Sequence, residues 1–581
     1  MTTRRRLLQF SGLAAAAIFA GGTASCGFEG GGSEGGGGAS GEIAILGPEL
    51  PTLDPQVISN GMWMVVRALL EPLVVQNNEG TDVVPGAAES WEMSEDGLTY
   101  TFTLREAKWS DGTPLTSEDF NKTYERLLSP SSAGAGVTLG ANSYVTSMNI
   151  KNAIPFQGGV ITDWNEVGVK TPDEKTVEFT LEAPNAGFLM GLTHASMCPM
   201  PMKVVEEHEA EWELPENIVT NGPFKMTATQ PNVSMTLEKN EEYWDAGAVA
   251  LNKINYKINA GAEVTIVPFE NGEVDIMGVG DPATLLRFEQ EPALQGQLKS
   301  AQPGSIYYLA LMHSQNDLLG SDIRIREALS LGMGRDIVAQ SQPKITATTS
   351  LVPQSVKGWE ESVGVAEDLE KAKQLLSDAG YPGGKGLPPI TILNGGNTSP
   401  VIQTIMSNWT ENLGIQVKND AVESGVYVQK RMALNPADYI GFYFGSFAAE
   451  LNWAKWVASL WSPTFTKPFS LNPTDYQEYL DLQQNKDLSP AELTAQLKEI
   501  ADTKCSAEVK EFDRLTTEAM SVVDPDASTA AFKEAALARE KCFIFLPIAM
   551  AGYHFAVNKR VTGFHPRPTG DQFYYKTLGV E

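Results

Sequence analysis

Basic residues are scarce in this 581-residue chain, and their scarcity excludes two kinds of partner. Lysine and arginine together number 43, against 72 aspartates and glutamates, so the formal net charge is −29 at pH 7. Nucleic-acid binding needs clustered basic side chains at the phosphates, and adhesion of a protein surface to anionic lipid needs them too. The composition therefore predicts no nucleic-acid partner, and we interpret the acidity as a source of solubility.

Cysteine is also rare. The four cysteines are Cys26, Cys198, Cys505 and Cys542, and the sequence contains no CxxC pair or Cys/His cluster. Structural zinc sites depend on such spacings, so none is predicted. If Cys26 is lipidated, three thiols remain and at most one disulfide can form. Cys505 and Cys542 both fall in a helical C-terminal region, so they are the likelier pair, and whether they form a disulfide stays open.

Catalytic motifs are absent as well. The five histidines are scattered and form no HExxH or H-x-H pair. The sequence has no G-x-S-x-G nucleophile elbow, no P-loop and no dinucleotide-binding fingerprint. We therefore expect a protein that is not an enzyme, with no catalytic residue, metal or cofactor. A secreted hydrolase or a surface adhesin is the alternative from another class.

The N-terminal segment has the pattern of an export signal. Residues 4–6 are three arginines, and residues 7–20 form an apolar run that is too short to span a membrane comfortably. The arginines resemble a twin-arginine export motif, and the Sec route is the alternative.

Residues 23–26, TASC, resemble a bacterial lipobox, in which the thiol of Cys26 becomes the lipid attachment point. Ordinary secretory cleavage that leaves a free Cys26 is the alternative. Residues 27–41 are rich in glycine and predict a flexible tether. We therefore expect a protein anchored by lipid to the outer face of the bacterial cell membrane, or a periplasmic one.

Residues 85–116 carry the clearest local pattern of the chain. Residues 99–104 alternate polar and apolar side chains with a period of two, as a half-buried strand does. Asp-Gly pairs at 96–97 and 111–112 are turn dipeptides. Thr116, followed three residues later by Asp119, predicts the start of a helix over 117–128. The segment is expected to form a β-hairpin and then a helix.

Later segments alternate between strand and helix patterns. Strands are predicted at 42–46, 177–181, 390–393 and 415–417. A helix is predicted at 400–413, because Pro400 suits its first position and Gly414 its end. Residues 390–417 are therefore predicted to form a β-α-β unit, and the whole chain is predicted to be an α/β protein.

The amino-acid sequence of the hairpin and the order of the motifs around it resemble those of a known family. The hairpin reads AESWE-S-DG-TYTF-LR----WSDG-P-T-EDF. The other motifs are TLDP at 52–55, EPL at 71–73, NGPF at 221–224, YWD at 243–245 and FENGEVDI at 269–276. Together they closely resemble the bacterial extracellular solute-binding proteins of family 5, the oligopeptide/dipeptide class that feeds ABC importers. The resemblance covers almost the whole chain after the tether.

The resemblance implies an α/β, bilobal, periplasmic-binding-protein-like fold of type II (cluster C-like), with an extra subdomain in the first lobe. The expected segments are a signal peptide with lipobox at 1–26, a tether at 27–41, the first lobe at 42–80 and 165–262, an inserted subdomain at 81–164, the second lobe at 263–544 and a return to the first lobe at 545–581.

The same resemblance implies a function in uptake. Peptides would be captured in the cleft between the lobes, buried by hinge closure and delivered by the monomeric protein to an ABC permease in the membrane. A non-peptide small molecule on the same fold, such as a nickel chelate, an oligosaccharide or a glycolipid, is the alternative ligand.

Residues 443–461, YFGSFAAELNWAKWVASLW, are dense in aromatics. They fall where family members carry a tryptophan and an aspartate that holds the peptide α-ammonium. Counting along the segment places Phe444 at the tryptophan and Glu450 near the aspartate. The family's own sequence motif is not preserved here, so the residue that anchors the ligand and the identity of the ligand stay open. A solvated acid is the plainer interpretation of Glu450, and core packing that of Trp453.

Other candidates come from outside this segment. Arg431 is a candidate partner for a peptide carboxylate, with plain surface charge as the alternative. Asn60 and Tyr144 are candidates from the first lobe. The predicted ligand-binding residues are Glu450, Phe444, Phe447, Tyr443, Trp453, Arg431, Asn60 and Tyr144.

Overall fold

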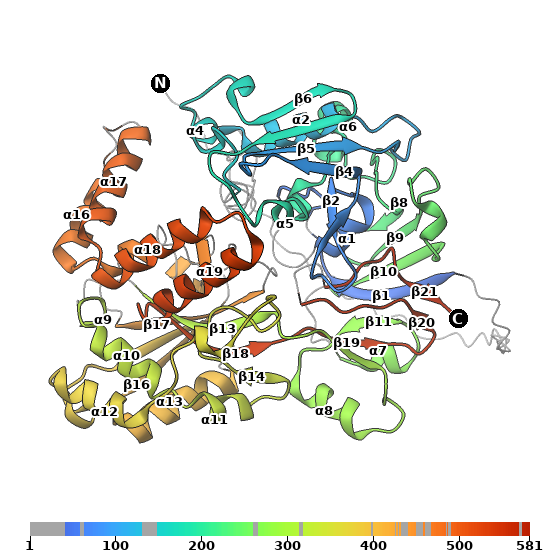
Figure 1. The fold of residues 1–581 in the computed structure, drawn as a ribbon. Helices are drawn as coiled ribbons and strands as arrows, with labels where there is room; N and C mark the ends of the chain where they lie inside the picture. The colour runs from blue at the N-terminus through green and yellow to red at the C-terminus, as the bar shows by residue number, and fades with distance from the viewer. Residues whose placement is uncertain are drawn as a thin grey trace, which may run out of the picture. The chain divides into compact units, whose positions relative to one another are not determined.

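The computed structural model describes residues 41–50, 52–57, 63–130, 148–259, 265–312, 318–396, 399–423, 426–427, 429–430, 440–448, 457–458, 466–483, 485, 488, 490–568 and 572–581. Within these ranges, strands and helices form two large sheets and one smaller sheet, each covered by helices (Figure 1). None of the helices described is both long and apolar enough to cross a membrane.

The first large sheet is built around the strand that opens the described chain. Its order is β12-β19-β11-β1-β10-β9-β8. Strand β1 pairs in parallel with β10 and β11, whereas the other pairs are antiparallel. The strands are β1 (Glu42–Pro48), β8 (Phe224–Gln230), β9 (Ser234–Lys239), β10 (Lys253–Asn259), β11 (Ile276–Gly278), β12 (Leu298–Ser300) and β19 (His554–Val557). Ile43 and Ile45 of β1 are buried, as the alternation of a half-buried strand requires.

The short elements of this part pack around the sheet. The helices are α1 (Trp63–Leu69), α5 (Phe188–Leu192), α6 (Met202–His208), α7 (Val267–Glu270) and α8 (Pro282–Gln290), and the short strand pairs are β2 (Val74–Gln76) with β3 (Val83–Pro85) and β20 (Val561–Thr562) with β21 (Gly579–Val580). Helices α7 and α8 bury Phe269, Leu285 and Phe288 against Met277 of β11 and Ala556 of β19. That small core holds α8 against β11 and β19.

The predicted hairpin and helix are confirmed and form a separate sheet. β4 (Ala88–Met93) and β5 (Thr99–Leu104) pair antiparallel, and the order is β4-β5-β7-β6 with β6 (Val169–Asp173) and β7 (Thr176–Thr180). Helix α2 (Ser117–Leu128) starts with a capping box, in which Asp119 accepts a hydrogen bond from the backbone N–H of Thr116 at 2.8 Å. Because β6 and β7 belong to this sheet, the sheet extends past residue 164. Helix α4 (Ala153–Gln157) lies between α2 and β6 in the chain.

The second large sheet has the order β14-β18-β13-β17-β15-β16. Its strands are β13 (Ser305–Leu311), β14 (Ile345–Ala347), β15 (Ile390–Gly395), β16 (Val417–Val422), β17 (Gly441–Ala448) and β18 (Phe545–Ala551). The predicted β-α-β unit is confirmed, because β15 and β16 are parallel and are joined by α13 (Pro400–Leu413). Gly414 closes α13 in the left-handed conformation, φ 69°.

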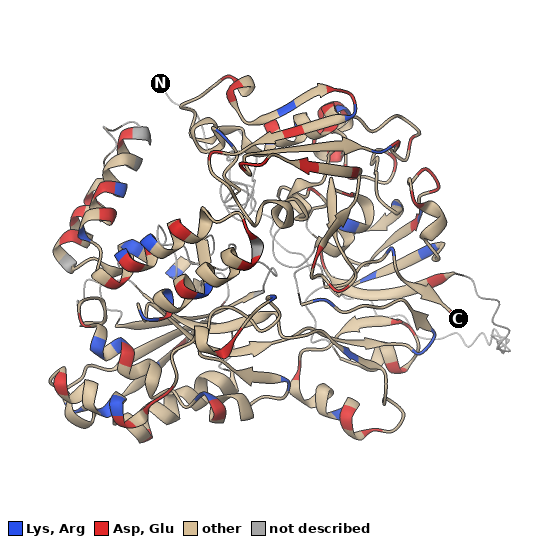
Figure 2. Cartoon of the chain, viewed as in Figure 1, with Lys and Arg blue, Asp and Glu red and all other residues tan. Residues whose placement is uncertain are grey.

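Helices cover this second sheet and extend beyond it. They are α9 (Leu318–Ser321), α10 (Ile323–Leu331), α11 (Arg335–Gln340), α12 (Leu369–Asp378), α16 (Pro473–Gln483), α17 (Pro490–Lys504), α18 (Ala507–Met520) and α19 (Pro525–Glu540). Figure 2 shows acidic and basic residues interspersed along these helices. Lys371 of α12, for example, lies 2.7 Å from Glu327 of α10. Helices α16 and α17 form a hairpin with a small apolar cluster of their own.

The chain passes between the two large sheets at positions that differ from the expected lobe boundaries. β11 and β12 still belong to the first sheet, so the passage lies between Ser300 and Ser305 and not near residue 263. β18 belongs to the second sheet and β19 to the first, so the return lies between Ala551 and His554. The positions where the chain crosses between the sheets depend on which strands pair, and those strands lie far apart in sequence. The local sequence pattern therefore does not predict them.

Cys505 and Cys542, the likelier pair for a disulfide, do not form one. Both residues, like Cys198, are buried free thiols. The Cys542 thiol lies 3.4 Å from the carbonyl of Ala538, and that of Cys505 lies 3.8 Å from the carbonyl of Asp502. Each thiol therefore points toward a backbone carbonyl of the helix that it follows. Both cysteines lie in a helical region, but their sulfurs are not bonded to each other.

Candidate functional site

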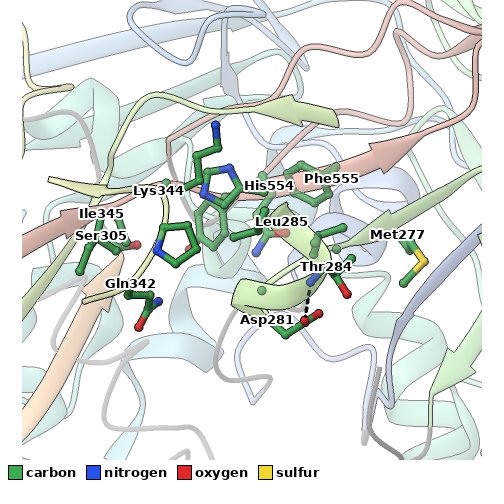
Figure 3. A pocket seen from close by; sticks show the side chains of 18 of the residues that line it. Met277, Asp281, Thr284, Leu285, Ser305, Gln342, Lys344, Ile345, His554 and Phe555 are labelled. Atoms are coloured by element: carbon green, nitrogen blue, oxygen red, sulfur yellow. Dashed lines mark hydrogen bonds between the residues drawn. The ribbon is translucent and has the colours of Figure 1, made fainter. Parts of the chain in front are cut away.

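A cavity of about 670 Å³ lies where the chain passes between the two large sheets (Figure 3). Its walls come from the end of β11, the start of α8, strands β13, β14 and β17, and the link from β18 to β19. The lining residues are Ile266, Met277, Gly278, Val279, Gly280, Asp281, Thr284, Leu285, Ser305, Tyr307, Gln342, Pro343, Lys344, Ile345, Ser446, Ala551, Gly552, Tyr553, His554, Phe555 and Gln572. Segments more than 300 positions apart in sequence, at Ile266 and Gln572, thus line one cavity.

Strand register places neutral polar groups on the wall formed by the second sheet. Tyr307 of β13 pairs with Ser446 of β17, so both side chains lie on one face with Ser305. The rings of Tyr307 and Phe444 on that face have centroids 5.7 Å apart. Burial raises the pKa of Tyr307, so its phenol stays neutral and can both donate and accept hydrogen bonds.

The two links between the sheets are held to each other beside the cavity. The backbone N–H of Ala301 donates to the carbonyl of Tyr553 at 2.9 Å, and that of Gly304 donates to the carbonyl of Ala551 at 3.1 Å. A Cβ on Gly304 would lie 2.0 Å from the carbonyl oxygen of Pro568, so only glycine allows this approach. The crossing is therefore a tight, hydrogen-bonded pair of links.

The ionisable groups of the lining have different environments. The Nζ of Lys344 lies 2.6 Å from a carboxylate oxygen of Glu289. The Nδ1 of His554 lies 2.8 Å from the Oγ of Ser300, and burial together with the nearby Lys344 lowers the pKa of this histidine. Asp281 is exposed, and its Oδ1 accepts a hydrogen bond from the backbone N–H of Thr284 at 2.7 Å, which caps α8.

The described parts of the predicted aromatic segment are strand β17 and residues 457–458, of which Val457 is buried. Tyr443 is only 8% exposed and lies against Tyr308 in the core, with ring centroids 6.1 Å apart. Phe447 lies on that same face of the strand, and both Phe444 and Phe447 are partly buried against the core. Ser446, which the sequence reasoning did not select, is the β17 side chain that lines the cavity.

The other predicted residues, Glu450, Trp453, Arg431, Asn60, Tyr144 and the lipidation residue Cys26, lie outside the described residues. Sequence reasoning also missed Asp281, Lys344 and His554. Asp281-Pro282 at the start of an amphipathic segment was a usable signal for the helix cap, but nothing local indicated that it faces a cavity.

Several of the sequence motifs meet at a second place, away from the crossing. The carboxylate of Glu71 in EPL accepts hydrogen bonds from the Tyr243 hydroxyl at 2.5 Å and the Trp244 indole at 2.6 Å. Burial raises the pKa of Glu71, opposed by these two hydrogen bonds and by Lys576 and Arg67. The guanidinium of Arg105 lies 3.6 Å from the centre of the Trp244 ring.

These contacts line a cavity of about 300 Å³ and join the C-terminal segment to the first sheet. Lys576 forms an ion pair with Asp245 at 2.7 Å and lies over the Trp244 ring. The motif residues thus hold the fold together. Across the described ranges, no group of three His, Cys, Asp or Glu side chains is placed to hold a metal ion.

Comparison with known proteins gives a consistent result. The sequence model of the family described as "Bacterial extracellular solute-binding proteins, family 5 Middle" matches residues 82–466. The chain is 32% identical over 398 residues to the "Probable deoxycholate-binding periplasmic protein YgiS" of Escherichia coli, covering 66% of this chain and 71% of that protein. It is 31% identical over 404 residues to the "Periplasmic oligopeptide-binding protein OppA" of Salmonella typhimurium, with the same two coverages.

Among solved structures, the fold is similar to that of a periplasmic oligopeptide-binding protein, OppAIV, from Borrelia burgdorferi. The TM-score is 0.70, and the match covers 93% of this chain and 100% of the other at 23% sequence identity. At that identity the likeness establishes the fold, a bilobal α/β binding-protein architecture.

Proposed function

This chain belongs to the bacterial extracellular solute-binding proteins of family 5, and from that premise we propose that it captures peptides for an ABC importer and delivers them to a membrane permease. The observation that carries the proposal is the cavity of about 670 Å³ at the crossing of the two large sheets. Ligand pockets in proteins have volumes of roughly 300–1,000 Å³, so the cavity is large enough for a short peptide.

The chemistry of the lining suits a peptide backbone. Ser305, Gln342, Ser446 and Gln572 offer neutral donors and acceptors, as a chain of amide groups requires. Gly278 and Gly280 leave open space where a side chain would otherwise stand. A roomy lining of this kind lets water fill the gaps around different side chains, and broad peptide specificity follows from that.

The paired links at the crossing support a hinge. Only two links connect the large sheets among the described residues, and backbone hydrogen bonds join them to each other. Rotation about such a pair would open and close the cavity, and the closed form would be the one that meets the permease. No catalytic step belongs to this cycle.

The sequence supports attachment at the membrane. Export directed by residues 1–26, lipidation at Cys26 and the glycine-rich tether at 27–41 would keep the monomeric protein outside the cytoplasm and close to its permease. One lipid modification of this kind holds a soluble domain near the bilayer without fixing its orientation.

A non-peptide ligand is the second candidate, because one relative is named as a probable deoxycholate-binding protein. A bile acid is a rigid anionic steroid, whereas the described cavity wall carries the carboxylate of Asp281. That charge disfavours a bound anion, so we rank the peptide first.

Mass spectrometry of the ligand that co-purifies with folded protein, expressed from residue 41, tests the proposal. We expect short peptides. The variant Ser446→Tyr, which places a large side chain in the cavity, should abolish their retention, while Ser377→Tyr on the exposed surface of α12 should not. A steroid or chelate in place of peptide would overturn the peptide assignment, and unchanged occupancy in Glu450→Ala would overturn the anchor role of Glu450.

A further inference from the structure

We propose that Asp281 makes the cavity selective for ligands with a cationic group, an ammonium or guanidinium, and therefore for basic over neutral peptides. This inference rests on the proposed function, since it names the class of peptide that the same cavity takes. It assigns a specificity role to a residue outside the aromatic segment where the ligand anchor was expected.

The charge balance of the described lining is the first argument. Its titratable groups are Asp281, Lys344, His554, Tyr307 and Tyr553. The Lys344 ammonium is neutralised by Glu289 at 2.6 Å. The histidine is half-buried next to Lys344, which favours its neutral form, and the tyrosines are neutral. The carboxylate of Asp281 is thus the charge of this lining that no described side chain balances.

The geometry of Asp281 is the second argument. One carboxylate oxygen accepts the Thr284 N–H at 2.7 Å, and none of the described basic side chains forms an ion pair with Asp281. On the same wall, the positions where Gly278 and Gly280 would carry a Cβ have no atom within 4 Å. Figure 3 shows Asp281 and Thr284 at one side of the cavity, with Lys344 and His554 away from them. A ligand cation can therefore approach the carboxylate from the open side.

We expect the carboxylate of Asp281 to form one charge-assisted hydrogen bond with the cationic group of the ligand. Such bonds are about twice as strong as neutral ones, and loss of one corresponds to roughly a tenfold loss of affinity. Because the carboxylate is exposed to water, salt should weaken the preference.

The variant Asp281→Asn isolates the charge from the helix cap. Asparagine caps a helix about as well as aspartate, so α8 should remain intact. Asp524→Asn is a matched control: Asp524 also precedes a proline, caps α19 by accepting from the backbone N–H of Ala527 at 2.8 Å, and does not line the cavity.

Calorimetric titration of protein from residue 41 with alanine tetrapeptides tests the inference. All three peptides carry a C-terminal amide. One is N-acetylated and neutral, one is N-acetylated with one lysine, and one has a free N-terminus and no lysine, so the last two separate a side-chain cation from the α-ammonium. We expect Asp281→Asn to lower affinity about tenfold for the lysine peptide, and less than twofold for the neutral one. A tenfold loss confined to the unblocked peptide would make Asp281 a contact of the α-ammonium and would overturn the selectivity for basic peptides. Asp524→Asn should match the wild type.

Equal losses for the lysine peptide and the neutral one, or no loss for the lysine peptide, would overturn the role of Asp281 while leaving peptide binding in place. Failure of the wild-type protein to bind any of the three peptides would instead overturn the proposed function, and this inference with it. Circular dichroism of each variant confirms that it is folded, and a loss that shrinks at 0.5 M salt supports the charge mechanism.

Discussion

The side-chain amide of Asn221 holds the backbone of Glu71 on both sides, across 150 positions of sequence. Its Oδ1 accepts from the Glu71 N–H at 3.0 Å, and its Nδ2 donates to the Glu71 carbonyl at 2.9 Å. Asn221 belongs to the NGPF motif and Glu71 to EPL. The motifs that identify the family therefore join two parts of one fold, and the cavity at the crossing of the sheets lies elsewhere.

Replacing Asn221 by alanine should destabilise the protein without touching the cavity. Asn221 is 3% exposed, so its loss leaves a buried backbone donor and acceptor unpaired. We expect the free energy of unfolding to fall by about 2–4 kcal/mol, measured by urea denaturation. Asn271→Ala, at an exposed position, should change it by less than about 0.5 kcal/mol. Equal effects of the two substitutions would contradict this account.

Glu71 should make stability depend on pH. Burial raises the pKa of the Glu71 carboxyl in the folded protein above its ordinary value of 4.5, so as pH rises the unfolded chain loses this proton before the folded one does. The stabilising contribution is complete below the unfolded pKa and is lost as pH rises through the folded pKa. We expect the unfolding free energy of the wild type, minus that of Glu71→Gln, to decrease between pH 4.5 and 8. A difference that stays constant or increases would refute the assignment.

Gly304 should be irreplaceable at the crossing between the sheets. A methyl group there would collide with Pro568, and the overpacking should cost about 1–3 kcal/mol of unfolding free energy in Gly304→Ala. Gly280→Ala is the control, since nothing lies within 4 Å of its added methyl group. Calorimetric melting of both variants tests this, and a Gly304→Ala protein as stable as wild type would show that the links are looser than described.

Tyr443 should act through packing. Truncating this core residue in Tyr443→Ala should lower the free energy of unfolding by about 3–5 kcal/mol, because it leaves a cavity beside Tyr308. Ser446→Ala, on the opposite, cavity-facing side of the same strand, should change it by less than about 0.5 kcal/mol. If Tyr443→Ala unfolds like the wild type and loses peptide binding, Tyr443 is a ligand residue after all.

Local elements were predictable because a few neighbouring residues determine them. The Thr116 and Asp119 capping box starts α2 where expected, and Pro400 and Gly414 delimit α13 at both ends. Each of these signals acts within one helical turn. The alternation of residues 99–104 likewise predicted β5.

The site was less predictable, since its residues come from many segments. The predicted aromatic segment overlaps β17, and the alternation of that strand sends Tyr443 into the core and leaves Ser446 at the cavity. Asp281 and His554 line the same cavity although they lie 273 positions apart in sequence. No local sequence pattern connects them. Shared location also misled the pairing of Cys505 with Cys542, whose thiols are free.

By itself, then, the sequence determined the elements, their order and the family, because short-range periodicity, caps and turns are written in adjacent residues. The tertiary structure alone decided where the chain crosses between the sheets and which charges face the cavity. Arg560 and Asp275, for example, form a two-pronged ion pair at 2.7 Å across 285 positions. Such contacts follow from strand pairing and packing of distant segments, whose free energy depends on the whole fold and not on any one stretch.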